Sequence, residues 1–169
     1  MEKKIRTIAS LNCNHFSAHL DEISLRNGER GERIRIDHPE AVGIVPFVTD
    51  EEIIMVRQFR YALGQTTLEI PAGKQDPGES PESCAKRELI EETGYEPKEL
   101  ELICSYAPAI GYSNEIIHLY AGYKLRKVNE KIDEREIDSI ERISLHKLRE
   151  MIKKGLILDG KTLIALSMV

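Results

Sequence analysis

Three glutamates stand at a spacing that could hold a divalent cation. Glu88, Glu91 and Glu92 lie at positions i, i+3 and i+4, so on a helix their carboxylates share one face. Without a cation, these charges repel one another and weaken the helix. Carboxylate oxygens suit hard ions, and magnesium takes a few carboxylates, several waters and substrate phosphate oxygens. The spacing indicates either a magnesium site or a solvated acidic helix face, and three glutamates alone favour the second.

The neighbouring residues predict the helix that would position these carboxylates. Ser80 can cap its start with Pro81 in the first turn, and Gly94 can end it. Ala85 and Leu89 fall on a different stripe from the glutamates and are expected to pack against a sheet. The helix would then present its acidic face away from its apolar contact.

The stretch 73–95, GKQDPGESPESCAKRELIEETGY, resembles the Nudix box. That signature is glycine, five residues, glutamate, seven residues, and then Arg-Glu-apolar-any-Glu-Glu-any-Gly-apolar. Eight fixed positions match: Gly73, Glu79, Arg87, Glu88, Leu89, Glu91, Glu92 and Gly94. Tyr95 departs from the aliphatic residue that is commoner in the last position. So many fixed positions at fixed spacing make a strong signal, and the chain is identified as a member of the Nudix family.

The resemblance implies a set of metal ligands. The predicted ligands are the carbonyl of Ala72 and the carboxylates of Glu88, Glu91 and Glu92. The expected ion is Mg²⁺, with Mn²⁺ as a possible substitute. Glu92 and Arg87 are counted as catalytic, and Arg87 is expected to support the loop and helix together with Glu79.

A late acidic stretch resembles the loop that carries the general base in ADP-ribose pyrophosphatases. It runs Asp133-Glu134-Arg135-Glu136-Ile137. The resemblance implies Glu134 as the base and Glu136 as a further metal ligand, with Glu136 the next choice of base. A general base must lie within hydrogen-bond reach of the attacking water. The alternative is a solvated acidic loop without a role, because most charged runs are of that kind.

Three residues outside the box are predicted to bind substrate by the same resemblance. Arg60 would contact phosphates or ribose, with Arg57 beside it, because a guanidinium suits bidentate phosphate contacts. The alternative for Arg60 is a salt bridge with Glu69. Glu115 matches a substrate-side glutamate of the subgroup, and alternatively it only begins a strand.

The remaining chain predicts one mixed α/β domain over residues 1–169. A hairpin is expected around Asn27-Gly28, with strands and helices along the rest of the chain: strands 41–49, 53–59, 100–106, 115–124 and 137–143, and helices from Ser144 to Lys154 and from Asp159 or Gly160 onward. The Nudix resemblance implies an α/β/α sandwich with a mixed central sheet and N-terminal antiparallel strands. It also implies a homodimer with strands 1–40 in the subunit contact.

Composition limits the function classes. A net charge of −5 argues against nucleic acid or an anionic membrane as main partner. Cys13, Cys84 and Cys104 lack metal-ligand spacing and are expected to be free thiols, with Cys84 a buried filler. No signal peptide or membrane-spanning stretch is evident in the sequence. The cytoplasm is the expected location.

The resemblance extends beyond the box and is closest to ADP-ribose pyrophosphatases. It implies hydrolysis of ADP-ribose to AMP and ribose 5-phosphate. One departure concerns the sugar: Ala109-Ile110-Gly111 replaces the usual Ser-Pro-Gly. The alternatives are another sugar nucleotide, NADH or a dinucleoside polyphosphate as substrate, or a non-catalytic domain that binds ADP-ribose and regulates another process. The intact glutamates argue against the last of these.

Overall fold

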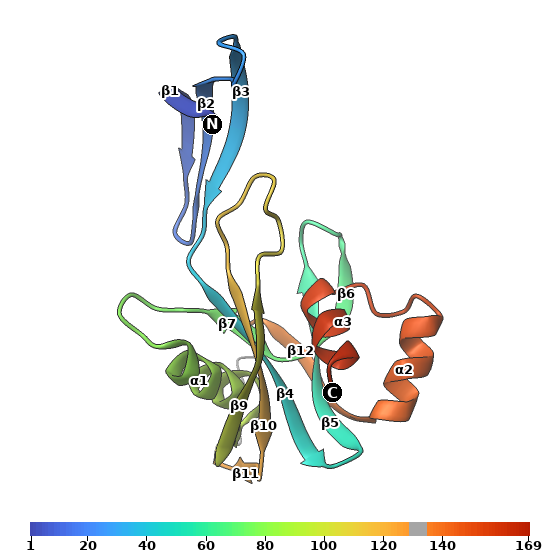
Figure 1. The fold of residues 1–169 in the computed structure, drawn as a ribbon. Helices are drawn as coiled ribbons and strands as arrows, with labels where there is room; N and C mark the ends of the chain where they lie inside the picture. The colour runs from blue at the N-terminus through green and yellow to red at the C-terminus, as the bar shows by residue number, and fades with distance from the viewer. Residues whose placement is uncertain (129–134) are drawn as a thin grey trace. The chain divides into compact units, whose positions relative to one another are not determined.

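The computed structural model describes residues 1–128 and 135–169. The described residues form two compact units. Figure 1 shows the ribbon, coloured by residue number from the N-terminus to the C-terminus. The first unit comprises residues 1–40 and 106–116, and the second is drawn from 41–105 and 117–169. The assignment of residues 1–169 to a single domain stays a prediction.

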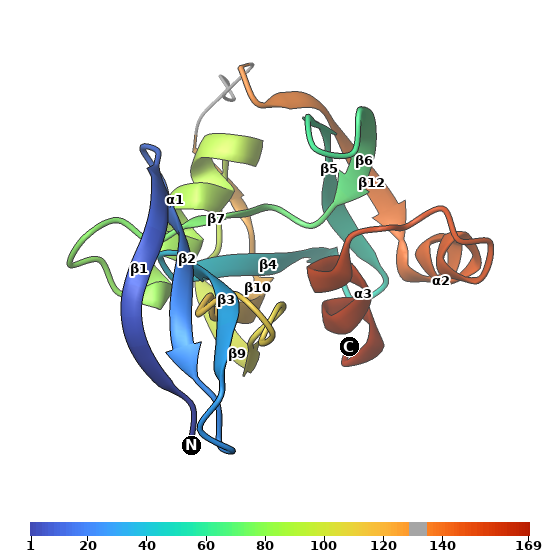
Figure 2. The same ribbon diagram turned by 90° about the horizontal axis from the view of Figure 1, so that it is seen from above.

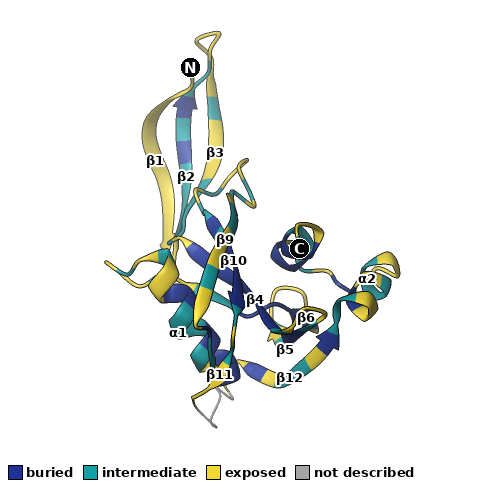
Figure 3. Ribbon diagram, turned by 60° about the horizontal axis from the view of Figure 1, so that its bottom comes forward, coloured by how far each residue is buried: buried dark blue, intermediate teal, exposed yellow. Residues whose placement is uncertain are grey.

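The first unit contains an antiparallel sheet of three strands in the order β1-β2-β3. These are β1 (Lys3–Asn12), β2 (Ser17–Ser24) and β3 (Arg30–Asp37). The predicted hairpin joins β2 to β3, and Gly28 in its turn has a φ of 89°, a left-handed conformation that glycine adopts without steric cost. Every residue of β1 is exposed, as the yellow ribbon in Figure 3 shows.

The second unit is built on a mixed sheet with the strand order β12-β5-β4-β10-β9. Two shorter strands extend it, because β6 pairs with β5 and β7 pairs with β4. β4 runs parallel to β10 and antiparallel to β5, which confirms the predicted mixed sheet. Its strands are β4 (Ala41–Thr49), β5 (Glu52–Arg60), β6 (Gln65–Glu69), β7 (Ala72–Lys74), β9 (Glu99–Tyr106), β10 (Ile117–Tyr123) and β12 (Ile137–Ser144), and a separate pair is formed by β8 (Tyr95–Glu96) and β11 (Arg126–Lys127).

Three helices accompany this sheet, and all three were predicted. They are α1 (Pro81–Thr93), α2 (Leu145–Lys153) and α3 (Gly160–Ser167). Ser80, Ser144 and Asp159 are their N-caps, since each side chain accepts a hydrogen bond from the first turn. α1 and α3 both contact β4 and lie on opposite sides of it (Figure 2). Among the described residues, none of the helices has the length and apolar character needed to cross a bilayer.

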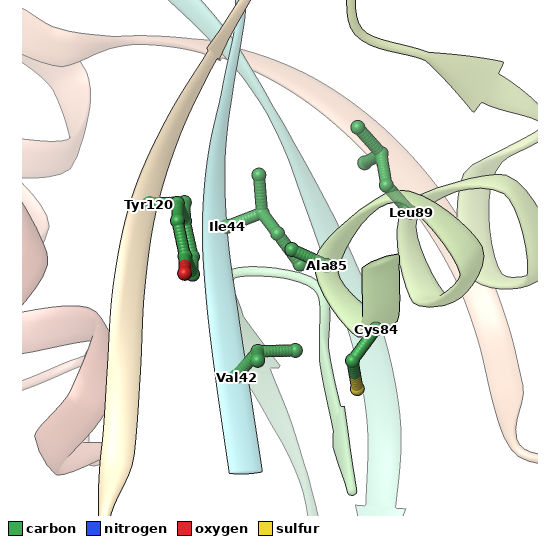
Figure 4. Packing of buried hydrophobic residues seen from close by; sticks show 6 residues of the cluster. All are labelled: Val42, Ile44, Cys84, Ala85, Leu89 and Tyr120. Carbon is green, nitrogen blue, oxygen red and sulfur yellow. The ribbon is translucent and has the colours of Figure 1, made fainter. Parts of the chain in front are cut away.

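The apolar stripe of α1 packs against the central strands. Ala85 and Leu89 are fully buried and meet Val42, Ile44 and Tyr120 of the sheet, as Figure 4 shows. The prediction that this stripe faces a sheet is therefore confirmed. Burial of these side chains from water is the main force that fixes the helix on the sheet.

The predicted free thiols are confirmed for all three cysteines, Cys13, Cys84 and Cys104. Cys84 is fully buried in the α1 cluster, and burial raises the pKa of its thiol to about 12. Since the thiolate is the reactive form, Cys84 is a packing residue, as predicted.

Candidate active site

The acidic helix begins and ends where its local signals predict. Ser80 Oγ accepts a hydrogen bond of 3.1 Å from the backbone N–H of Ser83. At the other end Gly94 has a φ of 76°, and its N–H donates to the carbonyl of Ile90 at 2.8 Å. These two ends fix the register of α1, and the register decides which glutamates share a face.

Arg87 is the centre of the ion pairs on the acidic face. Its Nε and Nη2 each donate to Glu79 at 2.9 Å, and Nη1 donates to Glu88 at 2.8 Å and to Glu91 at 3.1 Å. Nη2 also donates to the carbonyl of Lys74 at 3.0 Å. The Arg87 guanidinium holds the pKa of Glu79 down at about 2. One side chain thus links α1 to the loop before it, as the sequence suggested for Arg87 and Glu79.

Glu92 is a buried carboxylate. Only 5% of the residue is exposed, and its Oε2 accepts a hydrogen bond of 3.1 Å from the backbone N–H of Ala72. Burial raises the pKa of Glu92 to about 8, and the negative charge of Glu88 adds to this, while Lys161 and Arg60 oppose it. An ionised carboxylate in such surroundings is costly unless a cation accompanies it.

Glu88 occupies the space that a side chain at position 73 would need. A Cβ added to Gly73 would overlap the carboxylate of Glu88, so any side chain at position 73 would require that carboxylate to move. Burial raises the pKa of Glu88, and the charges of Glu91 and Glu136 add to it, whereas Arg87 opposes it. The carboxylates of this cluster therefore repel one another.

The two arginines predicted to bind substrate are held by carboxylates in this structure. Arg60 donates from Nε and Nη2 to the two oxygens of Glu69 at 2.8 and 2.6 Å. Arg57 is paired with Glu141. The alternative of an Arg60–Glu69 salt bridge is therefore present, and a role of Arg60 or Arg57 toward substrate stays a prediction.

The partner of Arg60 belongs to a buried network that the sequence did not reveal. Glu69 is 2% exposed and also receives hydrogen bonds from Lys161 and from Thr67. Burial alone would raise the pKa of Glu69, but hydrogen bonds and charge from Arg60 and Lys161 lower it to about 2. Glu69 is therefore ionised beside the acidic helix and is balanced by two cations.

Comparison with known proteins decides the family. A sequence model described as NUDIX domain matches residues 37–164, which include the whole acidic helix and its preceding loop. The chain belongs to the Nudix family. It is a Nudix hydrolase, and the eight matched positions of its box lie on β7, on α1, on the connection between them and at the C-cap of α1.

Several relatives resemble the chain over most of its length. A protein named methanol dehydrogenase activator from Bacillus methanolicus is 37% identical, covering 97% of this chain and 90% of the relative. The ADP-ribose pyrophosphatase of Bacillus subtilis (strain 168) is 36% identical, covering 88% and 81%. The GDP-mannose pyrophosphatase of Escherichia coli (strain K12) is 31% identical, covering 93% and 89%.

The fold has a match among solved structures. A crystal structure of an ADP compounds hydrolase superimposes with a TM-score of 0.82 at 24% sequence identity, covering 98% of this chain and 92% of the other. This likeness confirms the predicted fold, with its mixed central sheet.

The residues of this Nudix box fit a hard divalent cation. Glu92 offers a buried carboxylate and Glu88 a half-buried one, and the backbone N–H of Ala72 donates to Glu92. Within residues 1–128 and 135–169, no three Asp, Glu, His or Cys side chains already surround an ion-sized point. Magnesium needs only one or two carboxylates beside water and substrate phosphates, so this donor set suffices.

The predictions outside the box have different outcomes. Glu134, the predicted base, lies outside the described residues. Glu136 is exposed, and its charge acts on Glu88, so the structure brings it near the box helix. Glu115 belongs to the first unit, where its Oε1 lies 3.4 Å from Nδ1 of His38, and its contact with substrate stays a prediction.

Proposed function

We propose that this Nudix hydrolase cleaves the diphosphate bond of a nucleoside diphosphate sugar, with ADP-ribose as the first choice of substrate and AMP and ribose 5-phosphate as products. The observation that carries the proposal is the pair of carboxylates on one face of the Nudix helix, with Glu92 buried and Glu88 half-buried. Relatives named ADP-ribose pyrophosphatase and GDP-mannose pyrophosphatase support this class of substrate.

The proposed site would work through a bound divalent cation, Mg²⁺ first and Mn²⁺ as substitute. Such an ion, when bound, neutralises diphosphate charge and lowers the pKa of a coordinated water. Glu88, Glu92 and the Ala72 carbonyl are proposed to hold it, with Glu91 and Glu136 as further ligands. Arg87 bonds one oxygen of Glu88 and one of Glu91, so each of these two carboxylates would bind the ion through its other oxygen or after leaving Arg87.

The remaining chemical roles are assigned to flanking residues. Glu134 is proposed to accept the proton of the attacking water at a carboxylate oxygen, with Glu136 next in line. Arg60 is proposed to contact the substrate phosphates or ribose with the part of its guanidinium that is not bonded to Glu69, and Arg57 and Glu115 are proposed to assist. A cytoplasmic location is proposed as well, and the three free cysteines support it.

A panel of nucleotides tests the function. With Mg²⁺, the protein is expected to release AMP from ADP-ribose, and to act less well on GDP-mannose, NADH and diadenosine polyphosphates. A chelator should abolish turnover, because it removes the divalent cation from the acidic face of the helix. Product release is measured by chromatography. Faster turnover of another member of the panel would move the assignment to that substrate, and no turnover of any diphosphate would contradict the enzyme proposal.

A second candidate function is the regulation of another enzyme. The relative from Bacillus methanolicus is named for such an effect. The non-catalytic form of this proposal requires ADP-ribose to bind without being cleaved. The same panel, with calorimetry added, separates the two candidates. A non-catalytic regulator would bind ADP-ribose in calorimetry and release no products.

We also propose that the chain forms a homodimer through its leading strands. β1 exposes three large apolar side chains, Ile5 at 46%, Ile8 at 44% and Leu11 at 70%, and we propose that a second copy of the chain covers them. Light scattering is expected to give a molar mass twice the chain mass of 19.2 kDa. Leu11→Glu should shift the measured mass toward that of the monomer. A monomeric wild-type protein would contradict this proposal.

A further inference from the structure

Two residues at the start of α3 are buried although the proposed chemistry does not use them. Lys161 is 9% exposed and Thr162 is fully buried. A cation in the first turn of a helix opposes the helix dipole, and burying an ammonium group is costly unless it is paired. The positive charge of Lys161 therefore needs anionic partners outside α3.

One such partner lies at the end of β6. Lys161 Nζ donates to Glu69, and it lies 3.0 Å from Asp159 Oδ2. Glu69 is held at the same time by Nε and Nη2 of Arg60. Two cations and two anions thus form a charge-balanced network, which offsets the cost of burying Glu69 and Lys161.

Thr162 makes the second link between α3 and the same segment. Its hydroxyl donates to Asp159 Oδ2 at 2.5 Å and accepts from the backbone N–H of Ile70 at 2.9 Å. One oxygen of Thr162 therefore joins the N-cap Asp159 to the backbone of Ile70, which lies 92 residues before Thr162 in the chain.

The segment that α3 holds, residues 69–72, ends at the Nudix site. The carbonyl of Pro71 accepts from Ile44 N–H of β4 at 2.9 Å, and the N–H of Ala72 donates to Glu92 at 3.1 Å. Each of these four consecutive residues has a bond that fixes it. α3 supplies two of the bonds at one end of the segment, and Glu92 receives the bond at the other.

We propose that Lys161 and Thr162 are positioning residues for the metal site: they hold segment 69–72 so that the backbone of Ala72 stays in place beside Glu92. This inference rests on the proposed function, since it concerns the same site. The competing explanation is that both residues only attach α3 to the sheet. A positioning role predicts lost metal affinity, whereas simple attachment predicts lost stability alone.

The experiment measures Mn²⁺ binding by titration calorimetry without substrate, together with the melting temperature. Thr162→Val keeps the shape of the side chain and removes the hydroxyl, while Thr162→Ser keeps the hydroxyl. Ile143→Val, at a buried position of β12 paired with Ile53 of β5, is the control for loss of stability by a core substitution outside the segment. Lys161→Met is a second, independent variant that retains the aliphatic stem.

Thr162→Val and Lys161→Met are expected to raise the Kd for Mn²⁺ by roughly tenfold or more, the usual effect of losing a residue that supports a metal ligand. Thr162→Ser should restore the wild-type Kd, and Ile143→Val should leave it unchanged. Wild-type affinity in both Thr162→Val and Lys161→Met would overturn the inference, as would an equal loss in Ile143→Val. A Glu92→Gln variant that binds Mn²⁺ normally would instead overturn the metal site itself, and with it the proposed function.

Discussion

Replacing Glu92 by glutamine is expected to lower the turnover of ADP-ribose by roughly a thousandfold, because a catalytic metal ion contributes several kcal/mol and about 1.4 kcal/mol is worth a factor of ten. The amide is neutral and offers the ion a weaker ligand. Its shape is nearly that of the acid, so it fits the same buried position. Its oxygen can still accept the hydrogen bond from Ala72.

The stability of this variant is expected to move in the opposite direction. Burial raises the pKa of Glu92 to about 8, so the folded protein disfavours the ionised form that an unfolded chain would carry at neutral pH. Without metal, the melting temperature of Glu92→Gln should therefore equal or exceed that of the wild type. Glu91→Gln is the matched control, because the Glu91 side chain is 52% exposed, and it should lose less activity. A near-normal rate in Glu92→Gln would contradict the metal role.

The sequence predicted the parts of the site that depend on neighbouring residues. Ser80 and Gly94 mark the ends of α1 through bonds within a few residues. The pairing of Arg87 with Glu91 follows from helical spacing. Such local signals do not depend on the tertiary fold, and the helix is accordingly where the pattern places it.

The burial of the acids could not be read from the same pattern. On spacing alone, three glutamates on a helix favour a solvated surface, yet Glu92 is enclosed where β7 passes α1. Which side of a helix another strand crosses depends on the whole fold. The resemblance to the Nudix family, and not helical periodicity, supplied the metal assignment.

The network around Glu69 was still harder to predict from the sequence. Lys161 and Thr162 contact residues 92 positions away, and a single sequence carries no signal of such pairs. One local clue existed, since a lysine in the first turn of a helix is unfavourable. The salt bridge with Glu69 was considered only as the alternative role of Arg60, and the structure contains it.

Replacing Gly73 by alanine is expected to disable the site although it changes no charged group. A Cβ at this position overlaps the carboxylate of Glu88, so either Glu88 must turn away or β7 must move from α1. Overpacking of this kind costs about 1–3 kcal/mol of stability. Displacing Glu88 removes one of the proposed oxygen donors, and we expect Mn²⁺ affinity to fall by roughly tenfold to a hundredfold.

Calorimetric Mn²⁺ titration and ADP-ribose turnover measure this effect. Gly160→Ala is the matched control, because a Cβ there meets no atom within 4 Å and alanine favours a helix over glycine. It should preserve both metal affinity and rate. If Gly73→Ala also kept wild-type metal affinity, Glu88 could hold no ion from the position it has here.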